Sequence, residues 1–308
     1  MSVERPNQVR EDEPLSRYTT VGTGGPAGFF ARCGSQGALQ EALAWAAGEG
    51  IEVRVLGSGS NLLVADSGVD GLVVKLDRDL AKIEVDGLEM LCGGGARLPS
   101  VAAAAAKAGL SGLEFGVSIP GSVGGAVRMN ANAYGGELAR TLLWAEVVDR
   151  SGVNRRSPEE FDFTYRHSNL GPGEIVASAR FRLEAADPEQ VRLALADLRA
   201  RRKEAQPWGV RTFGSTFKNP SDERAGGRSA GQLLDAAGCR DLRVGSAGFS
   251  EKHANFIVNH GDATTAEVVE VMAEGKRRVR AEFGVELEAE VQVFGPVEFP
   301  DDWKGEGP

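Results

Sequence analysis

Cysteine is scarce in this 308-residue sequence, and histidine and aromatic residues are few. The three cysteines, Cys33, Cys92 and Cys239, are far apart, odd in number and free of any C-x-x-C or zinc-ligand spacing. The sequence therefore lacks the signature of a disulfide scaffold or a zinc site, and we expect a protein without a metal in a reducing cytoplasm. With three histidines and no G-x-S-x-G elbow, a Ser-His-Asp hydrolase is not favoured.

Long apolar runs and an excess of positive charge are also missing. No run of 18 apolar residues is present, so we expect no membrane span. The start, MSVERPNQVREDEP, is charged and lacks the apolar region of a signal peptide. The formal net charge is −9, so a basic surface for nucleic acid is not expected. A pocket can still be locally basic, so a small anionic ligand is compatible with this charge.

The spacing of apolar residues predicts a chain of mixed helices and strands. Ser35 is expected to cap the first helix. The expected helices are 36–49, 98–108, 188–205, 230–237 and 264–283. The expected strands are two short ones within 83–92, and 52–56, 71–76, 141–150, 174–183, 212–220, 255–259 and 285–293.

Glycine, with 41 residues, is abundant, and it gathers in two loops of the first half. GSGSNLL (57–63) follows an expected strand, and GVSIPGSVGGAVRMNANAYGGE (116–137) holds six glycines. Neither is a P-loop or a dinucleotide fingerprint, and GTGGPA (22–27) is discounted because no apolar strand leads into it. A single such loop is as well explained by a surface turn as by an anion nest. The pair favours an extended, phosphate-bearing ligand.

Three further segments carry polar groups that serve either structure or chemistry. Arg166 in YRHSN has the fork that suits a carboxylate, although a surface arginine explains it better on pattern alone. In FGSTFKNP (213–220), alternation predicts that Ser215 shares one face with two phenylalanines. In VELEAEVQV (285–293), alternation predicts a strand with a wet acidic face, and it does not single out one glutamate.

Eight segments, in order over about residues 15–296, carry a resemblance to a known family. They are TTVGTGGPA, VLGSGSNLLV, GLEFGVSIPGSVGGAVRMNANAYG, FTYRHS, GSTFKNP, AGQLLDAAG, SEKHANFIVN and LEAEVQVFG. Together they resemble the UDP-N-acetylenolpyruvoylglucosamine reductase (MurB) family. The resemblance implies an α+β chain: a two-lobed α/β FAD-binding domain of the vanillyl-alcohol-oxidase (PCMH) type and a C-terminal α+β substrate domain. The implied ranges are 1–88 and 89–199 for the lobes, 200–298 for the substrate domain and 299–308 for a frayed tail.

The activity implied by this resemblance is that of a cytoplasmic flavoenzyme of peptidoglycan precursor synthesis. Non-covalent FAD would be the cofactor and NADPH the co-substrate, entering the substrate cleft in turn. UDP-N-acetylglucosamine enolpyruvate would be reduced to UDP-N-acetylmuramate. No nucleic-acid or membrane partner is implied.

The family's motifs also imply the site residues. Arg166 would hold the substrate carboxylate, Ser215 would protonate the α-carbon and Glu290 would support the polarised intermediate. The implied substrate contacts are Lys218, Asn219 and His253. Backbone N–H groups of GSVGGA, with GSGSN as a second clamp, would bind the FAD diphosphate. The implied FAD-binding residues are Gly57, Ser58, Gly59, Ser60, Asn61, Leu62, Gly116, Ser118, Ile119, Pro120, Gly121, Ser122, Gly124, Gly125 and Ala126.

The sequence departs from the family pattern in two places, and three alternative functions stay open. Phe213 stands where a small residue is expected, and the only tyrosines are 18, 134 and 165, so the chain is a short form without the tyrosine lid. The nearest alternative is a flavin oxidase of the same fold, for which Cys33 or Cys92 could form a thioether to the flavin. A nucleotide-sugar-binding protein without catalysis and a flavin-free UDP-sugar transferase are the others.

Overall fold

The computed structural model describes residues 4–303 and separates them into two compact units. Unit 1 is formed by residues 4–13, 28–58 and 70–202, and unit 2 by residues 14–27, 59–69 and 203–303. Two short N-terminal segments thus belong to the unit that holds the C-terminal third of the chain. The domain ranges expected from the sequence stay predictions.

All five expected helices form, and each ends close to its expected limits. They are α1 (Gln36–Gly48), α2 (Leu98–Lys107), α4 (Pro188–Ala205), α5 (Ala230–Ala236) and α6 (Thr265–Phe283). Ser35 caps α1, because its Oγ accepts from the Ala38 amide at 3.2 Å. A further short helix, α3 (Val123–Arg128), lies inside the glycine-rich stretch and was not expected there. No helix of residues 4–303 has the length and apolarity needed to span a membrane.

Unit 1 contains two sheets, and the mixed α+β class is confirmed. Most of a four-stranded sheet lies here, in the order β1 (Val9–Pro14), β2 (Pro26–Cys33), β5 (Val69–Leu76), β3 (Val53–Val55), with β3 and β5 parallel. The second sheet is antiparallel, in the order β12 (Gly152–Arg156), β11 (Leu142–Asp149), β13 (Ile175–Arg182), β7 (Glu89–Gly93), β6 (Ile83–Asp86). Two small pairs are β8 (Leu110–Ser111) with β14 (Glu184–Ala185), and β9 (Asn132–Ala133) with β10 (Gly136–Glu137).

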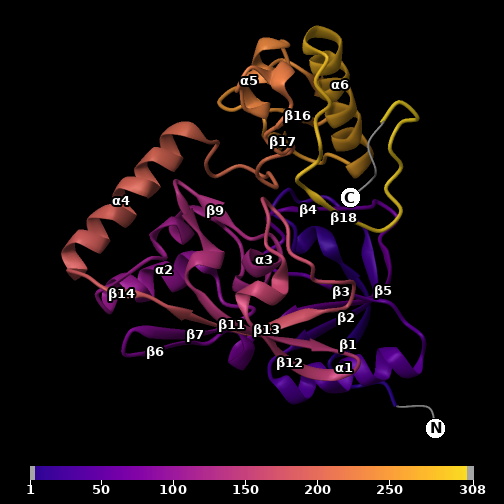
Figure 1. Cartoon of the computed structure of the whole chain (residues 1–308). Helices are drawn as coiled ribbons and strands as arrows, with labels where there is room; N and C mark the ends of the chain where they lie inside the picture. The colour runs from indigo at the N-terminus through magenta and orange to yellow at the C-terminus, as the bar shows by residue number, and fades with distance from the viewer. Residues whose placement is uncertain (1–3, 304–308) are drawn as a thin grey trace. The chain divides into compact units, whose positions relative to one another are not determined.

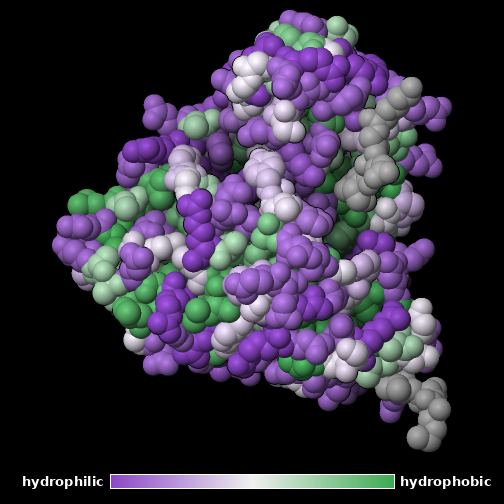
Figure 2. Space-filling model, viewed as in Figure 1, coloured by the Kyte–Doolittle hydropathy of each residue, from purple (hydrophilic) through white to green (hydrophobic). Residues whose placement is uncertain are grey.

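Each sheet of unit 1 buries an apolar face against a helix. The α1 residues Leu39, Leu43 and Trp45 share one buried cluster with Leu72 and Val74 of β5. The short helix α3 packs on β13 and β7, which places it over the middle of the second sheet (Figure 1). Most of the face shown in Figure 2 is hydrophilic.

Unit 2 is a small antiparallel sheet covered by two helices. Its strands are β15 (Arg243–Val244), β16 (Ala247–Phe249) and β17 (Ile257–Asn259). Figure 1 shows α5 and α6 beside this sheet, in orange and yellow. A second pair, β4 (Leu62–Val64) and β18 (Gln292–Phe294), is parallel. The α6 residues Val268, Val269, Met272 and Val279 are buried, so this helix packs an apolar face into the core of unit 2.

Two of the expected strands are wrong. Residues 212–220 form only isolated bridges, at Ser215 and Phe217, and 285–293 form one bridge before β18 begins. The cause in the first segment is Gly214, whose φ of +88° turns the chain and breaks the alternation. The two phenylalanines of FGSTFKNP are therefore in the core, whereas Ser215 is only half-buried and does not share their environment.

The tail is partly folded where a frayed end was expected. The Trp303 ring lies 4.6 Å from the ring of Phe299 and 6.3 Å from that of Phe217, centroid to centroid. Lys276 Nζ lies 4.7 Å from the Trp303 centroid. Residues 299–303 thus pack on unit 2, and the rest of the expected tail, 304–308, lies outside the described residues.

Candidate active site

The two glycine-rich loops meet in unit 1. A Cβ at Gly57 would lie 2.5 Å from Ser122 Oγ, so a larger residue at 57 would require the serine side chain to move. The Leu98 amide donates to the Gly121 carbonyl at 3.0 Å, which ties the second loop to α2. Gly116 and Ser118 are buried in the turn before it, and Ser118 O accepts from Arg202 of α4 at 2.5 Å. Residues of the two loops therefore lie side by side in the fold.

The amides of this loop pair are unequally available to a ligand. Val123 and Gly124 donate to the carbonyls of Ala96 and Gly94, both at 2.8 Å. Gly125 donates to Ser122 Oγ, and Ala126 donates to Ser122 O. The start of α3 is thus already satisfied. Within residues 4–303, the amides of Ser58, Gly121 and Ser122 are among those of the loop pair that have no hydrogen-bond partner, so these N–H groups can fit a diphosphate.

The second half of GSGSN belongs to unit 2, where it reaches the Glu290 segment. Asn61 Nδ2 donates to the Glu290 carbonyl at 3.0 Å, and the Gln292 amide donates to the Asn61 carbonyl at 3.1 Å. The Thr20 amide holds the Gly59 carbonyl at 2.9 Å. Leu62 opens the buried strand β4, so its side chain belongs to the core and not to a surface loop.

Ser215 and Glu290 lie on neighbouring segments of unit 2. The Glu290 amide donates to the Thr216 carbonyl at 2.9 Å, and Phe217 bridges Ala289. Ser215 itself bridges Phe256 on its other side. Both residues are half-buried. Their backbones are thus fixed by hydrogen bonds, while their side chains keep a path to solvent.

Asn255 holds the Ser215 segment from behind. Its backbone carbonyl accepts from the Thr216 amide at 2.8 Å. Its side chain forms two further bonds to the Phe217 backbone and is buried. The sequence analysis did not identify this role of Asn255, because an asparagine within an apolar strand pattern does not reveal which backbone it binds.

The three implied substrate contacts lie around α5 and Glu288. Lys218 Nζ is 3.3 Å from Glu288 Oε2 in a partly exposed ion pair. Asn219 Oδ1 accepts from the Ala230 amide at 3.1 Å, which leaves Asn219 Nδ2 without a partner in residues 4–303. His253 Nδ1 accepts from the Asn255 amide at 3.2 Å. Burial, with Arg240 nearby, lowers the pKa of His253, so the neutral ring with a proton on Nε2 is favoured.

Arg166 belongs to unit 1 and sits on a tight turn. The backbones of Thr164 and His167 exchange two hydrogen bonds of 3.2 Å, and Arg166 takes a left-handed φ of +58° between them. Such a conformation is uncommon for a residue other than glycine. Arg166 NH1 donates to the Asn132 carbonyl at 3.3 Å, and Asn130 Nδ2 donates to the Thr164 carbonyl at 3.2 Å. The MNANAYG segment therefore supports this turn.

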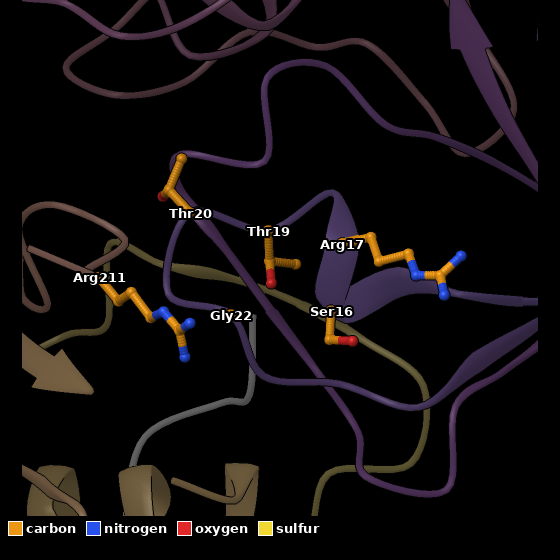
Figure 3. Close-up of a pocket in the computed structure, with 6 residues that line it drawn as sticks. All are labelled: Ser16, Arg17, Thr19, Thr20, Gly22 and Arg211. Atoms are coloured by element: carbon orange, nitrogen blue, oxygen red, sulfur yellow. The ribbon is translucent and has the colours of Figure 1, made fainter. Parts of the chain in front are cut away.

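A small hollow of unit 2 is lined by Ser16, Arg17, Thr19, Thr20, Gly22 and Arg211. Figure 3 shows the Arg211 side chain extending toward Gly22 and the Arg17 side chain extending away from the other labelled residues. Arg211 NH1 donates to the Gly261 carbonyl, and Thr20 Oγ1 donates to the Thr212 carbonyl. These groups serve the backbone, and the two guanidinium groups do not converge on one ligand position.

Known proteins match this chain over almost its whole length. The UDP-N-acetylenolpyruvoylglucosamine reductase 2 of Symbiobacterium thermophilum is 42% identical, with 95% of this chain and 94% of that protein covered. The reductase of Novosphingobium aromaticivorans is 44% identical, with coverages of 96% and 99%. The chain belongs to the UDP-N-acetylenolpyruvoylglucosamine reductase family. The family's C-terminal domain model matches residues 206–294, and an FAD-binding domain model matches 27–156.

The crystal structure of the UDP-N-acetylenolpyruvylglucosamine reductase of Thermus caldophilus agrees with this family. It has a TM-score of 0.81 at 40% identity and covers 93% of this chain and 100% of its own. As a member of the UDP-N-acetylenolpyruvoylglucosamine reductase family, the chain is an FAD-dependent oxidoreductase of peptidoglycan synthesis with NADPH as co-substrate.

The oxidase alternative is not favoured by this family membership, and the cysteines add a physical reason. Cys33 and Cys92 are fully buried free thiols. Burial raises the pKa of each to about 12, so neither supplies the thiolate that a thioether to flavin needs. His167 is the first histidine of the sequence, so residues 1–166 offer no histidine for a covalent link to flavin.

Proposed function

We propose that this chain reduces UDP-N-acetylglucosamine enolpyruvate with NADPH in the cytoplasm, and that Ser215, Glu290 and Arg166 carry the chemistry. The observation that supports it most is the hydrogen-bonded contact between the Ser215 and Glu290 segments. It brings a hydroxyl and a carboxyl onto neighbouring segments of one compact unit. FAD, when bound, supplies the hydride-transfer chemistry that no side chain can provide.

Arg166 holds the substrate carboxylate in this proposal. Its left-handed turn and its support from the Asn132 carbonyl favour a single orientation of the guanidinium. A fixed cation of this kind stabilises negative charge that grows as the double bond is reduced. Preorganised donors of this type are worth on the order of 10²–10³ in rate.

Ser215 delivers the proton to the α-carbon of the enolpyruvyl group. A hydroxyl is a weak acid, but the developing carbanion is a strong base, so position matters more than acidity. Glu290 supports the polarised intermediate from the neighbouring segment. Lys218, Asn219 and His253 are proposed as substrate contacts, through Lys218 Nζ, Asn219 Nδ2 and His253 Nε2.

The FAD diphosphate is proposed to lie at the paired glycine loops. The Gly57–Ser122 approach and the free amides of Ser58, Gly121 and Ser122 fit such a group. Gly59, Ser60 and Asn61 continue the first loop, and Ile119 and Pro120 flank the second. No nucleic acid or membrane is proposed as a partner.

An anaerobic titration of the purified protein tests this function. NADPH is added first and UDP-N-acetylglucosamine enolpyruvate second, while the visible spectrum is recorded. The proposal predicts a flavin spectrum that NADPH bleaches and that only the enolpyruvyl sugar restores. A protein that is colourless and takes up no FAD contradicts it. A bleached flavin that ignores the sugar and recovers in oxygen moves the function to an oxidase.

A further inference from the structure

A lysine follows three buried apolar residues in strand β5, and its ammonium reaches the first glycine loop. Lys75 Nζ donates to the Gly57 carbonyl at 2.5 Å. Lys75 is half-buried between Val74 and Leu76, both of which are buried. A charge at this position costs desolvation free energy, which an exposed lysine would not lose. Solubility alone therefore does not explain a half-buried lysine here.

This contact fixes the direction of one peptide group. A trans peptide is planar, and its C=O and N–H point in opposite directions. Because the Gly57 carbonyl points at Lys75, the Ser58 N–H points away from it. The Ser58 amide is one of the groups without a partner in residues 4–303. The contact with Lys75 therefore orients the Ser58 N–H, which has no partner, away from Lys75.

The charges around Lys75 are not balanced. The charged groups that act on it are Arg32, Asp77 and Arg97. Arg32 and Asp77 pair with each other at 3.5 Å, so Lys75 and Arg97 are left over. The Arg97 backbone bridges Ser122, which places this second cation beside the same loop pair. Burial, together with Arg32 and Arg97, lowers the pKa of Lys75, so a nearby negative charge would stabilise its ammonium form.

We propose that Lys75 is a positioning residue for FAD, which orients the Ser58 amide toward the cofactor's diphosphate and, with Arg97, leaves two positive charges there to match it. The inference rests on the FAD binding of the family and on the proposed place of the diphosphate. It is independent of the roles given to Arg166, Ser215 and Glu290. It also explains how an acidic protein holds a dianionic group through loops whose one basic residue, Arg128, donates to backbone carbonyls of residues 170–174.

The test measures the release of FAD from the holoenzyme and its uptake by the stripped full-length chain, both by flavin fluorescence. Lys75→Met removes donor and charge, and its dissociation constant for FAD should rise about 10- to 100-fold. Lys75→Arg keeps both and should stay within about fivefold of wild type. Lys82→Met is the matched control, because Lys82 lies in the same unit in an exposed pair with Asp79, and it should bind FAD normally.

Two further readouts separate this role from a merely structural one. Riboflavin lacks phosphate, so its affinity should be the same in wild type and Lys75→Met. Release of FAD from wild type should accelerate with salt, because charge attraction is screened. This second readout does not depend on whether the Met variant folds.

Equal FAD retention by wild type and Lys75→Met overturns the inference, as does an equal loss of riboflavin affinity or a release rate that salt does not change. A wild-type chain that takes up no FAD overturns the proposed function instead.

Discussion

The side chain of Asn255 and the backbone of Phe217 form a reciprocal pair of hydrogen bonds. The Phe217 amide donates to Asn255 Oδ1 at 3.0 Å, and Asn255 Nδ2 donates to the Phe217 carbonyl at 2.8 Å. An amide side chain here acts as a strand partner would. Because both residues are buried, these bonds are shielded from water and hold the segment that carries Ser215.

Replacing Asn255 by alanine should therefore destabilise unit 2. Two buried backbone groups of Phe217 would lose their partners, so the free energy of unfolding should fall by about 2–4 kcal/mol. Chemical denaturation of both proteins measures the change. Asn154→Ala, at an exposed position of β12, is the control and should have no measurable effect. Equal stability of Asn255→Ala and wild type contradicts the assigned role.

Asn130 should affect substrate binding, although its side chain is buried and contacts the turn that carries Arg166 only at the backbone. It donates to the Thr164 carbonyl and to Glu137 Oε1, at 3.2 and 2.8 Å. Asn130→Ala would loosen the turn that presents Arg166, and the KM for the enolpyruvyl sugar should rise about tenfold. Steady-state kinetics measure it. Asn132→Ala keeps the backbone carbonyl that Arg166 uses and should retain a KM near that of wild type. An effect of Asn132→Ala as large as that of Asn130→Ala contradicts the assignment.

His253 should make stability depend on pH. Its pKa in the fold lies below the reference value of 6.5, chiefly because of burial and then because of Arg240. The unfolded chain thus binds the proton more readily, and the stability from neutral His253 is complete above pH 6.5 and declines as the pH falls below it. An NMR titration of the imidazole signals measures the value directly. A His253 pKa at or above 6.5 contradicts the lone-pair role given to Nδ1.

Acid denaturation of the chain should release the flavin from the protein in unmodified form. Cys33 and Cys92 are buried with strongly raised pKa values, so no thioether to FAD is expected. Acid precipitation followed by absorbance of the supernatant separates free from bound flavin. Yellow colour that stays with the precipitated protein contradicts this account and returns weight to the oxidase alternative.

Much of the fold could be predicted from the sequence because its signals are local. The helix that follows Ser35 has its cap and its apolar spacing in adjacent residues, and it forms as expected. The alternation of 285–293 was misleading for a physical reason. Val285, Leu287 and Val291 are buried while Glu286 and Glu288 are exposed, yet residues 285–291 form one isolated bridge, at Phe217, before β18 begins at Gln292. Alternating burial requires an extended chain and not a ladder of hydrogen bonds.

The site was harder to predict, because its determinants are contacts between distant segments. Arg166, Ser215 and Glu290 follow from family motifs. The pattern alone favoured a surface arginine at 166, left Ser215 open between structure and chemistry, and did not single out Glu290. The partners of Lys75, Asn130 and Asn255 lie 18, 34 and 38 residues away. Nothing in their immediate sequence shows which carbonyl or amide each one binds.

Separate measurement of the two half-reactions in Ser215→Ala tests the central claim most directly. Anaerobic stopped-flow records the loss of flavin absorbance with NADPH and its return with UDP-N-acetylglucosamine enolpyruvate. If Ser215 delivers the proton to the α-carbon, the first rate should stay within about twofold of wild type, and the second should fall by roughly 10² or more. A second half-reaction at the wild-type rate, or an equal loss in both, contradicts the role of Ser215.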